Sequence, residues 1–142
     1  MNAQSVTTHL RTLGHRISRA REAIIEIFSS TTKPLTAIDV LLTLEKVGLP
    51  VNKTTVYREL EFLLAQHLLQ EVQIESGIIH YESAAQDHHH HLICQTCKQI
   101  VAVDPKEIEQ GIDKLARRVR INEGFTISDH SLEFYGHCAH CQ

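Results

Sequence analysis

Apolar residues recur at helical spacing in three successive segments of the amino-terminal half. These segments are "SRAREAIIEIFSS" (18–30), "TAIDVLLTLEKVG" (36–48) and "NKTTVYRELEFLLAQH" (52–67). The second opens with Thr-x-x-Asp, a capping-box pattern, and closes at Gly48, and the third opens with Asn52, a favourable N-cap residue. The pattern therefore predicts three helices over these ranges.

The pattern changes after the third helix. Residues 68–82, "LLQEVQIESGIIHYE", are rich in β-formers and contain Gly77 near their middle, which predicts a β-hairpin. Three helices followed by a two-stranded ribbon is the order of a winged helix-turn-helix. Residues 83–87, "SAAQD", are small and polar, which is typical of a hinge.

The carboxyl-terminal half alternates strand-like and helical stretches. Strands are predicted over 91–94 and 100–104, a helix from about 106 to 122, and a third strand over 125–138. This half is therefore expected to be a small α+β domain, and the whole chain belongs to the α+β class.

Charged residues and potential metal ligands are distributed unevenly along the chain, which the net charge of −3 does not show. Residues 1–70 hold 8 Lys/Arg and 6 Asp/Glu, whereas residues 71–142 hold 6 and 11 together with eight of the 11 histidines. The net charge alone argues against a nucleic-acid partner, but the first half is mildly basic, whereas the second half is acidic and rich in metal ligands. No stretch approaches 18 apolar residues and the start lacks a signal-peptide pattern, so we expect a cytoplasmic protein without a membrane partner.

The four cysteines form two C-x-x-C pairs, Cys94 with Cys97 and Cys138 with Cys141. In a cytosolic protein such pairs indicate metal binding more often than disulfides. Each turn can supply two thiolates, and two turns complete a closed Cys₄ zinc site. The 40 residues between the pairs exceed a simple zinc-knuckle loop, so a folded domain must bring them together. Structural cysteines without metal, and a redox pair, are the alternatives.

A run of four histidines, His88 to His91, precedes Cys94. If the strand extends back through the run, alternate side chains face opposite ways. His88 and His90 then point to one side and His89 and His91 to the other, so one strand would serve two metal sites. The alternative is a solvated polar end of the strand.

The predicted helix over 52–67 gathers polar side chains at its amino-terminal end. Bases, phosphates and thymine methyls are contacted by such residues when a recognition helix enters a major groove. A solvated helix face is the alternative, and the basic residues upstream, Arg11, Arg16, Arg19 and Arg21, favour DNA. The candidate DNA-contacting residues of the helix are Lys53, Thr54, Thr55, Tyr57 and Arg58.

Four segments together resemble the ferric uptake regulator family. They are "LGHRISRAREAII", "NKTTVYRELEFL", "HHHHLICQTC" and "DHSLEFYGHCAHC", and they occur in the family's order from about residue 10 to 141. The resemblance implies a dimeric, metal-dependent transcriptional repressor of metal homeostasis, not an enzyme. It implies a winged-helix DNA-binding domain (1–82), a hinge (83–87) and a metal-binding dimerisation domain (88–142).

The resemblance also assigns residues to three metal sites and to DNA. It implies structural zinc at the four cysteines and a regulatory metal at the hinge, held by Glu82, His89 and His91. It places a further site within the dimerisation domain at His88, His90, Glu109 and His130. Tyr57 and Arg58 match the family's DNA-contacting pair, and Arg16 a basic residue near the minor groove. We expect the homodimer to bind an A·T-rich inverted repeat in double-stranded DNA.

One departure concerns the hinge site. Pro34 stands where the iron-sensing branch has a histidine, so the fourth ligand is open. His80 shares strand parity with Glu82 and is the first candidate, although it could be only a residue of the wing; Glu71 and His67 are alternatives.

The missing histidine favours Zn²⁺ as the regulatory metal, with Fe²⁺ and Mn²⁺ as alternatives. A metal storage or buffer protein is the rival of another class, but it would not need the helix over 52–67. A metallohydrolase is disfavoured because the chain contains no H-E-x-x-H motif.

Overall fold

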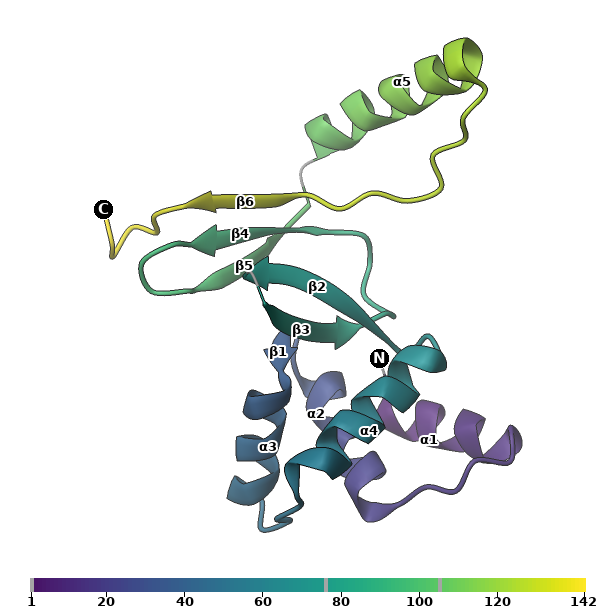
Figure 1. Cartoon of the computed structure of the whole chain (residues 1–142), viewed down its shortest axis with the longest axis vertical. Coiled ribbons are helices and arrows are strands. Elements are labelled where there is room, and N and C mark those ends of the chain that lie inside the picture. Colours follow the sequence, from purple (N-terminus) through teal and green to yellow (C-terminus); the bar gives the residue numbers. More distant parts are fainter. Residues whose placement is uncertain (1, 76, 105) are drawn as a thin grey trace. The chain divides into compact units, whose positions relative to one another are not determined.

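The computed structural model describes residues 2–75, 77–104 and 106–142; Met1, Ser76 and Pro105 lie outside the described residues. The chain forms two compact units, Met1–Asp87 and His88–Gln142. Their helices and strands are labelled in Figure 1. Among the described residues, no helix has the length and apolar character needed to cross a bilayer.

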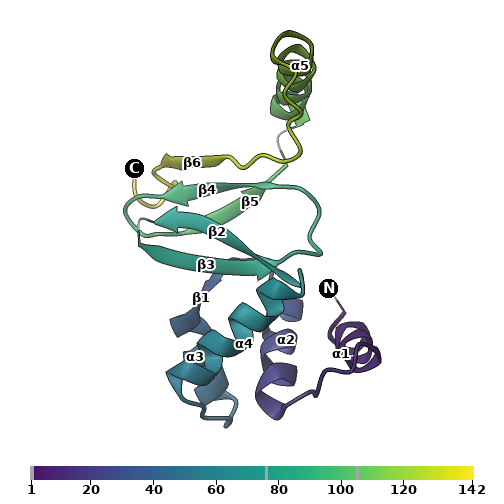
Figure 2. The ribbon, with the colours of Figure 1, turned by 45° about the vertical axis from the view of Figure 1, so that its right-hand side comes forward.

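The first unit is a winged helix-turn-helix. Its helices are α1 (Ala3–Thr12), α2 (Arg19–Ser30), α3 (Ala37–Lys46) and α4 (Lys53–Ala65). Its strands are β1 (Leu35–Thr36), β2 (Leu69–Glu75) and β3 (Ile78–Ser83), which form an antiparallel sheet in the order β1-β3-β2. Both ribbon views place α2, α3 and α4 on one side of this sheet (Figures 1 and 2).

Side-chain caps fix where the three predicted helices begin. Ser18 Oγ accepts a hydrogen bond from the backbone N–H of Arg21 (3.1 Å) at the start of α2. Thr36 and Asp39 form the reciprocal capping box of α3. Asn52 Oδ1 accepts from the backbone N–H of Thr55 (2.8 Å) at α4. These starts confirm the predictions from local sequence, because a cap satisfies backbone donors that the first turn leaves unpaired.

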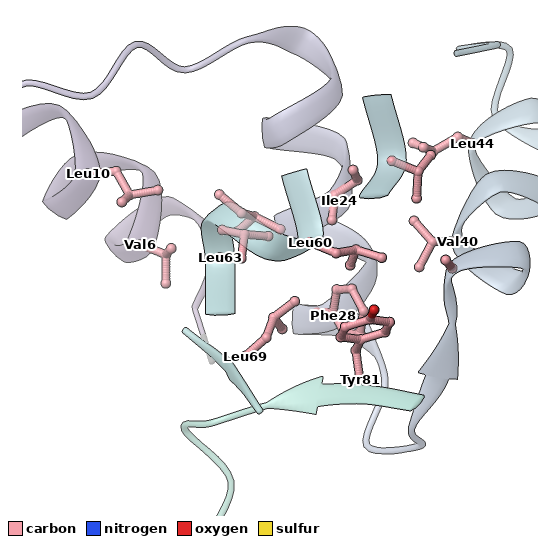
Figure 3. Packing of buried hydrophobic residues seen from close by; sticks show 13 residues of the cluster. Val6, Leu10, Ile24, Phe28, Val40, Leu44, Leu60, Leu63, Leu69 and Tyr81 are labelled. Atoms are coloured by element: carbon pink, nitrogen blue, oxygen red, sulfur yellow. The ribbon is translucent and has the colours of Figure 1, made fainter. Parts of the chain in front are cut away.

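The core of this unit is a single apolar cluster contributed by all four helices and the sheet (Figure 3). Leu60 of α4 and Phe28 of α2 are almost fully buried, and Tyr81 of β3 joins them from the sheet. Burial raises the pKa of the Tyr81 hydroxyl, and the nearby Glu71 carboxylate raises it further. The apolar stripe of α4 therefore packs inward, and its opposite face is left for solvent or a ligand.

Two elements of this unit were not predicted. α1 has only a sparse apolar stripe, Ala3, Val6 and Leu10, among polar residues; Asn2 caps it and the core buries Leu10. β1 has two residues and exists because its backbone pairs with His80 and Tyr81 of β3. Both depend on tertiary contacts that local patterns do not encode.

The second unit contains β4 (His90–Cys94), β5 (Ile100–Val103), α5 (Lys106–Glu123) and β6 (Glu133–Gly136). The sheet order is β5-β4-β6, with β4 antiparallel to β5 and parallel to β6. A parallel neighbour needs a long crossover connection, and the segment containing α5 supplies it.

Some predicted boundaries were wrong. β6 covers only four residues of the range 125–138, because its pairing with β4 begins at His91 opposite Glu133. β4 begins at His90, so His88 and His89 precede the strand. Ser83, expected in the hinge, is the last residue of β3, where it pairs with Leu69.

Several large apolar residues of the second unit remain exposed in the single chain. Leu115, Ile121 and Phe125 are at least half exposed in α5 and the segment after it, and Leu92 and Val101 are partly exposed on the sheet. Apolar exposure on this scale is typical of a surface that another molecule covers.

Candidate metal centres and nucleic-acid interface

The sheet of the second unit brings the two cysteine pairs together. Cys94 ends β4, and the turn that follows returns to β5 through backbone bonds from Lys98 N to Cys94 O and from Cys94 N to Gln99 O (both 2.9 Å). β6 runs beside β4 and delivers Cys138 and Cys141 just beyond its end. Parallel pairing of β4 and β6 therefore places both turns at the same edge of the sheet.

The four sulfur atoms lie within 4.8 Å of one another. Cys97 Sγ and Cys138 Sγ are 3.7 Å apart, much farther than the roughly 2.05 Å of a disulfide. A tetrahedron with Zn–S bonds of about 2.3 Å has edges of about 3.8 Å. The observed spacing thus fits four thiolates around one zinc ion.

The pKa values of the cysteine thiols indicate that this cluster would bind a cation. Backbone N–H groups of Cys97 and Cys138 lower the pKa of the Cys94 thiol to about 5, and the Cys138 N–H lies 3.4 Å from Cys94 Sγ. The pKa of Cys141 is raised to about 12, first by the hydrogen bond that its thiol shares with Cys138. Sulfur atoms this close cannot all ionise on their own, and a divalent metal would replace the protons that they share.

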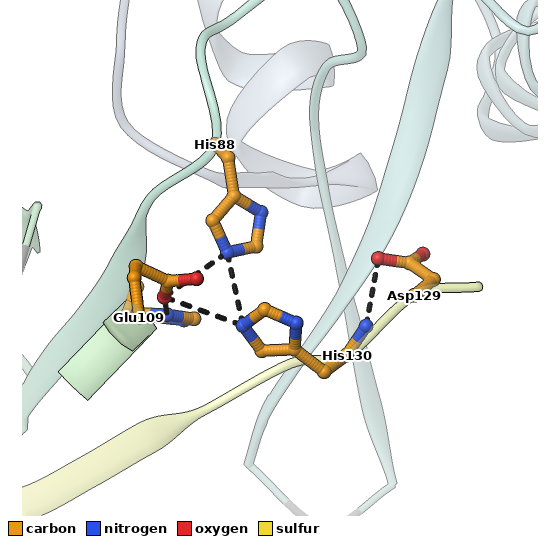
Figure 4. Close-up of polar contacts among 5 residues, drawn as sticks. His88, Glu109, Asp129 and His130 are labelled. Carbon is orange, nitrogen blue, oxygen red and sulfur yellow. Dashed lines mark hydrogen bonds and ion pairs between the residues drawn. The ribbon is translucent and has the colours of Figure 1, made fainter. Parts of the chain in front are cut away.

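A second cluster combines three imidazoles with one carboxylate (Figure 4). Nε2 of His90, His130 and His88 lie 2.6, 3.3 and 3.4 Å from Glu109 Oε1. His88 Nε2 and His130 Nε2 are 3.1 Å apart. Zinc–nitrogen and zinc–oxygen bonds of about 2.1 Å would separate tetrahedral ligands by about 3.4 Å. The spacings of His88, His130 and Glu109 are close to this value, whereas His90 and Glu109 are at hydrogen-bond distance. One metal ion would replace the shared proton of that pair and move the two atoms apart.

Packing and hydrogen bonds hold this second cluster. His90 is buried in β4, Glu109 projects from the first turn of α5, and His130 comes from the segment before β6. Asp129 Oδ1 accepts a hydrogen bond from the backbone N–H of His130 (2.8 Å), an anchor that the sequence did not reveal. The hydrogen bond with His90 is the main cause that lowers the pKa of the Glu109 carboxyl, which keeps that oxygen ionised.

The remaining histidines of the run form their own pair. The rings of His89 and His91 have centroids 4.9 Å apart, whereas the ring of His88 lies 4.8 Å from that of His90. The four imidazoles therefore group by alternation, as the parity of the sequence predicted, although the strand itself starts only at His90.

The candidate ligands of the first unit do not all share a face of its sheet. His67 lies outside the sheet, between α4 and β2. Glu82 and His80 lie on the side of β3 opposite the buried Tyr81, and Gln70 Nε2 donates to Glu82 Oε1 (2.7 Å). Glu71 pairs directly with Tyr81, so it lies on the other side. Nδ1 of His80 is buried and has no hydrogen-bond partner in the part of the chain that the structure describes.

The amino-terminal end of α4 presents the predicted DNA-contacting residues. Lys53, Thr54, Tyr57 and Arg58 are exposed, and Lys53 Nζ lies 5.6 Å from the centre of the Tyr57 ring. The Thr55 hydroxyl instead donates to Asn52 Oδ1 (2.9 Å), so its proton serves the helix cap. Arg16, in the loop between α1 and α2, is also exposed.

The β2–β3 hairpin differs from this positive end. The sequence has no Lys or Arg between Arg58 and Lys98, and β2 carries Glu71 and Glu75. The Lys and Arg residues of the first unit therefore all lie on α4 or upstream of it.

A winged helix-turn-helix joined to a unit with two four-residue ligand clusters defines a metal-dependent, DNA-binding regulator of transcription. The chain belongs to the ferric uptake regulator family, whose model matches residues 12–135. The ferric uptake regulation protein of Neisseria meningitidis serogroup C is 32% identical, in an alignment that covers 100% of this chain and 96% of that protein.

Solved structures agree with this assignment. The ferric uptake regulator from Francisella tularensis, determined with iron, superimposes with a TM-score of 0.78 at 26% identity, covering 90% of this chain and 95% of that one. The regulator from Helicobacter pylori gives a TM-score of 0.83 at 20% identity, covering 99% and 94%, which is a likeness of fold. These findings confirm the family and the fold class that the sequence motifs predicted.

Proposed function

We propose that this chain is a repressor of metal-homeostasis genes that is switched on by a divalent metal at the junction of its two units. The observation that supports it is the placement of Glu82 in the last strand of the DNA-binding unit, with His89 and His91 at the start of the metal-binding unit. A metal bound by all three would tie the units together across residues 84–87.

The switch works by reducing conformational freedom. Without metal, the two winged helices of a dimer sample many arrangements, and few of these fit DNA. With metal, the two copies of α4 are held for successive major grooves, about 34–36 Å apart on one face of the duplex. Affinity rises because a conformational cost is removed, with no new protein–DNA contact.

His80 is the proposed fourth ligand of this regulatory site. It shares the face of β3 that carries Glu82, and its buried Nδ1 is available for coordination. Glu71 is unsuitable because it lies on the opposite face with Tyr81.

Two observations rank the regulatory metals. Two imidazoles and one carboxylate suit Zn²⁺ and Fe²⁺ better than Mn²⁺, which favours oxygen ligands. Relatives named ferric uptake regulation protein favour Fe²⁺, whereas Pro34 in place of a histidine favours four-coordinate Zn²⁺. We therefore propose Fe²⁺ and Zn²⁺ ahead of Mn²⁺.

The other two clusters have supporting roles in this proposal. Cys94, Cys97, Cys138 and Cys141 would hold a structural Zn²⁺ that closes the second unit. His88, His90, Glu109 and His130 would hold a further ion that fixes the start of α5 to β4. The exposed apolar residues of α5 and of the sheet would meet their copies in the homodimer.

The test of this function is a DNA-binding titration of the metal-loaded and chelated protein. An A·T-rich inverted repeat should be bound about 5- to 150-fold more tightly with the regulatory metal than without it, the range typical of coupled sites. A scrambled duplex of equal composition is the control, and Fe²⁺ (without oxygen), Zn²⁺ and Mn²⁺ are compared at buffered free concentrations. A storage protein would bind the metals but leave DNA affinity unchanged.

The end of α4 gives a second test. Tyr57→Ala should reduce discrimination against altered sites by about 1–3 kcal/mol, because the ring contacts base edges or thymine methyls. Arg58→Ala should weaken specific and scrambled duplexes alike and make the salt dependence shallower by about one unit for each phosphate that is no longer neutralised. Binding at several salt concentrations measures both, and unchanged affinity in both variants would exclude α4 as the reading helix.

A further inference from the structure

The Arg21 side chain joins three parts of the first unit. Its Nε lies 2.6 Å from Glu59 Oε2 in α4, and its Nη1 donates to the backbone carbonyl of Arg16 (2.8 Å). Its guanidinium carbon lies 3.6 Å from the centre of the Phe62 ring, also in α4. One planar cation thus connects the start of α2, the reading helix and the loop that precedes α2.

This arrangement restrains the second part of a loop whose first part is held by backbone hydrogen bonds from Gly14 N to Arg11 O and from His15 N to Leu10 O (both 3.0 Å). Residues 13–18 connect α1 and α2, and Gly14 adopts a left-handed backbone conformation (φ +82°). The His15 ring packs edge-on against Phe62, with centroids 5.0 Å apart. Phe62 therefore contacts both the loop and the Arg21 guanidinium, while the Arg16 side chain remains exposed.

Arg21 is poorly placed to bind phosphate itself. The side chains of Arg21 and Glu59 are only 15% and 14% exposed, and the carboxylate neutralises the guanidinium at short range. Two of its nitrogens, Nε and Nη1, already donate to Glu59 and to the Arg16 carbonyl. Arg21 therefore differs from a phosphate-binding arginine, because its charge is used in contacts within the protein.

We propose that Arg21 is a positioning residue, which fixes the Arg16 loop against α4 so that Arg16 and the start of α4 contact one DNA site together. The inference rests on the proposed DNA contact of Arg16. Arginine is required because a planar fork can hold a carboxylate and a carbonyl while stacking on a ring, whereas lysine has a single point charge. Without this restraint, the loop must be ordered when DNA binds, and affinity falls.

A double-mutant cycle on the full-length, metal-loaded dimer tests this role. Arg21→Lys keeps the charge and should weaken specific DNA binding on the order of 10-fold, within the range for coupled neighbours. Arg16→Ala removes the side chain but keeps the carbonyl that Arg21 holds. In the Arg16→Ala background, Arg21→Lys should then reduce DNA affinity less than about 2-fold, because the side chain that Arg21 positions is absent.

A matched pair on α4 keeps the test valid if Arg21→Lys folds poorly. Glu59→Gln should weaken DNA binding although it removes a negative charge. Glu61→Gln removes an equal charge from an exposed position of the same helix and should leave affinity equal or slightly higher. Thermal unfolding of each variant, and a hydroxyl-radical footprint of the groove that Arg16 contacts, separate positioning from a loss of fold.

The outcomes distinguish this inference from the proposed function. Three outcomes would overturn the positioning role. Arg21→Lys could reduce DNA affinity equally in both backgrounds, or in neither, or Glu59→Gln and Glu61→Gln could have the same effect. An Arg16→Ala variant that binds like wild type would also overturn it, while metal-dependent binding by the wild type would leave the function intact. Wild type that ignores metal would instead refute the function.

Discussion

Replacing Cys138 with serine is expected to remove about one tightly bound zinc ion per chain and to unfold the second unit. The four sulfur atoms fit a single tetrahedral ion, and Cys138 also donates its backbone N–H to Cys94 Sγ. Apparent zinc-binding energies in small structural sites are about 10–16 kcal/mol, which equals or exceeds the roughly 5–15 kcal/mol stability of an ordinary domain. If loss of one thiolate releases the zinc ion, the binding energy that is lost is comparable to the whole stability of the unit, so the unit is expected to unfold.

Metal analysis after purification without chelator, together with thermal unfolding, measures this effect. His140→Ala is the matched control, because His140 lies in the same turn as Cys138 but is exposed and outside the sulfur cluster. The control should keep its zinc and its melting temperature. If Cys138→Ser keeps both as well, the Cys₄ site is refuted.

Replacing His89 with alanine is expected to abolish the metal-activated part of DNA binding and to leave the dimer intact. In the proposed switch His89 is one of three ligands that tie the two units together, so its loss removes the coupling between metal and DNA. Affinity with metal should fall to the metal-free level, a change of about 5- to 150-fold. His90→Ala should be milder for repression, because His90 belongs to the cluster inside the second unit.

His90 is 1% exposed, so its replacement also leaves a cavity. His88→Ala is therefore included as a less disruptive change in the same cluster, since His88 is nearly half exposed. Sedimentation reports the dimer, and binding of a labelled inverted repeat with and without metal reports the switch. Equal losses from His89→Ala and His88→Ala would mean that the two faces of the histidine run are not functionally separate.

The sequence revealed those features whose causes are local. The starts of α3 and α4 could be predicted because Thr36 and Asn52 satisfy the backbone donors of the turn that follows them. The grouping of His88 with His90 and of His89 with His91 followed from the alternation of an extended chain. The two C-x-x-C turns indicated a Cys₄ cluster for the same reason, since each turn is built from four consecutive residues.

Features that depend on distant partners could not be predicted. Alternation within residues 125–138 indicated a strand but not that β6 would pair parallel to β4, since direction depends on the path of the chain through α5. Arg21 was counted among the cations that favour DNA, yet its partner Glu59 lies 38 positions away and no local pattern connects them. The hydrogen bond from the Thr55 hydroxyl to Asn52 Oδ1 could not be predicted either, because it depends on the side-chain geometry of the folded cap.

The β2–β3 hairpin without a single Lys or Arg has a consequence for how such a protein searches a chromosome. Attraction to arbitrary DNA depends on the number of phosphates that cations neutralise, and in the first unit every Lys and Arg precedes the hairpin in the chain. Each dimer should dissociate from unrelated sequence quickly and spend more of its time free in solution. A larger share of a small protein pool then remains available to sense the metal, so few copies suffice to report a change in its concentration.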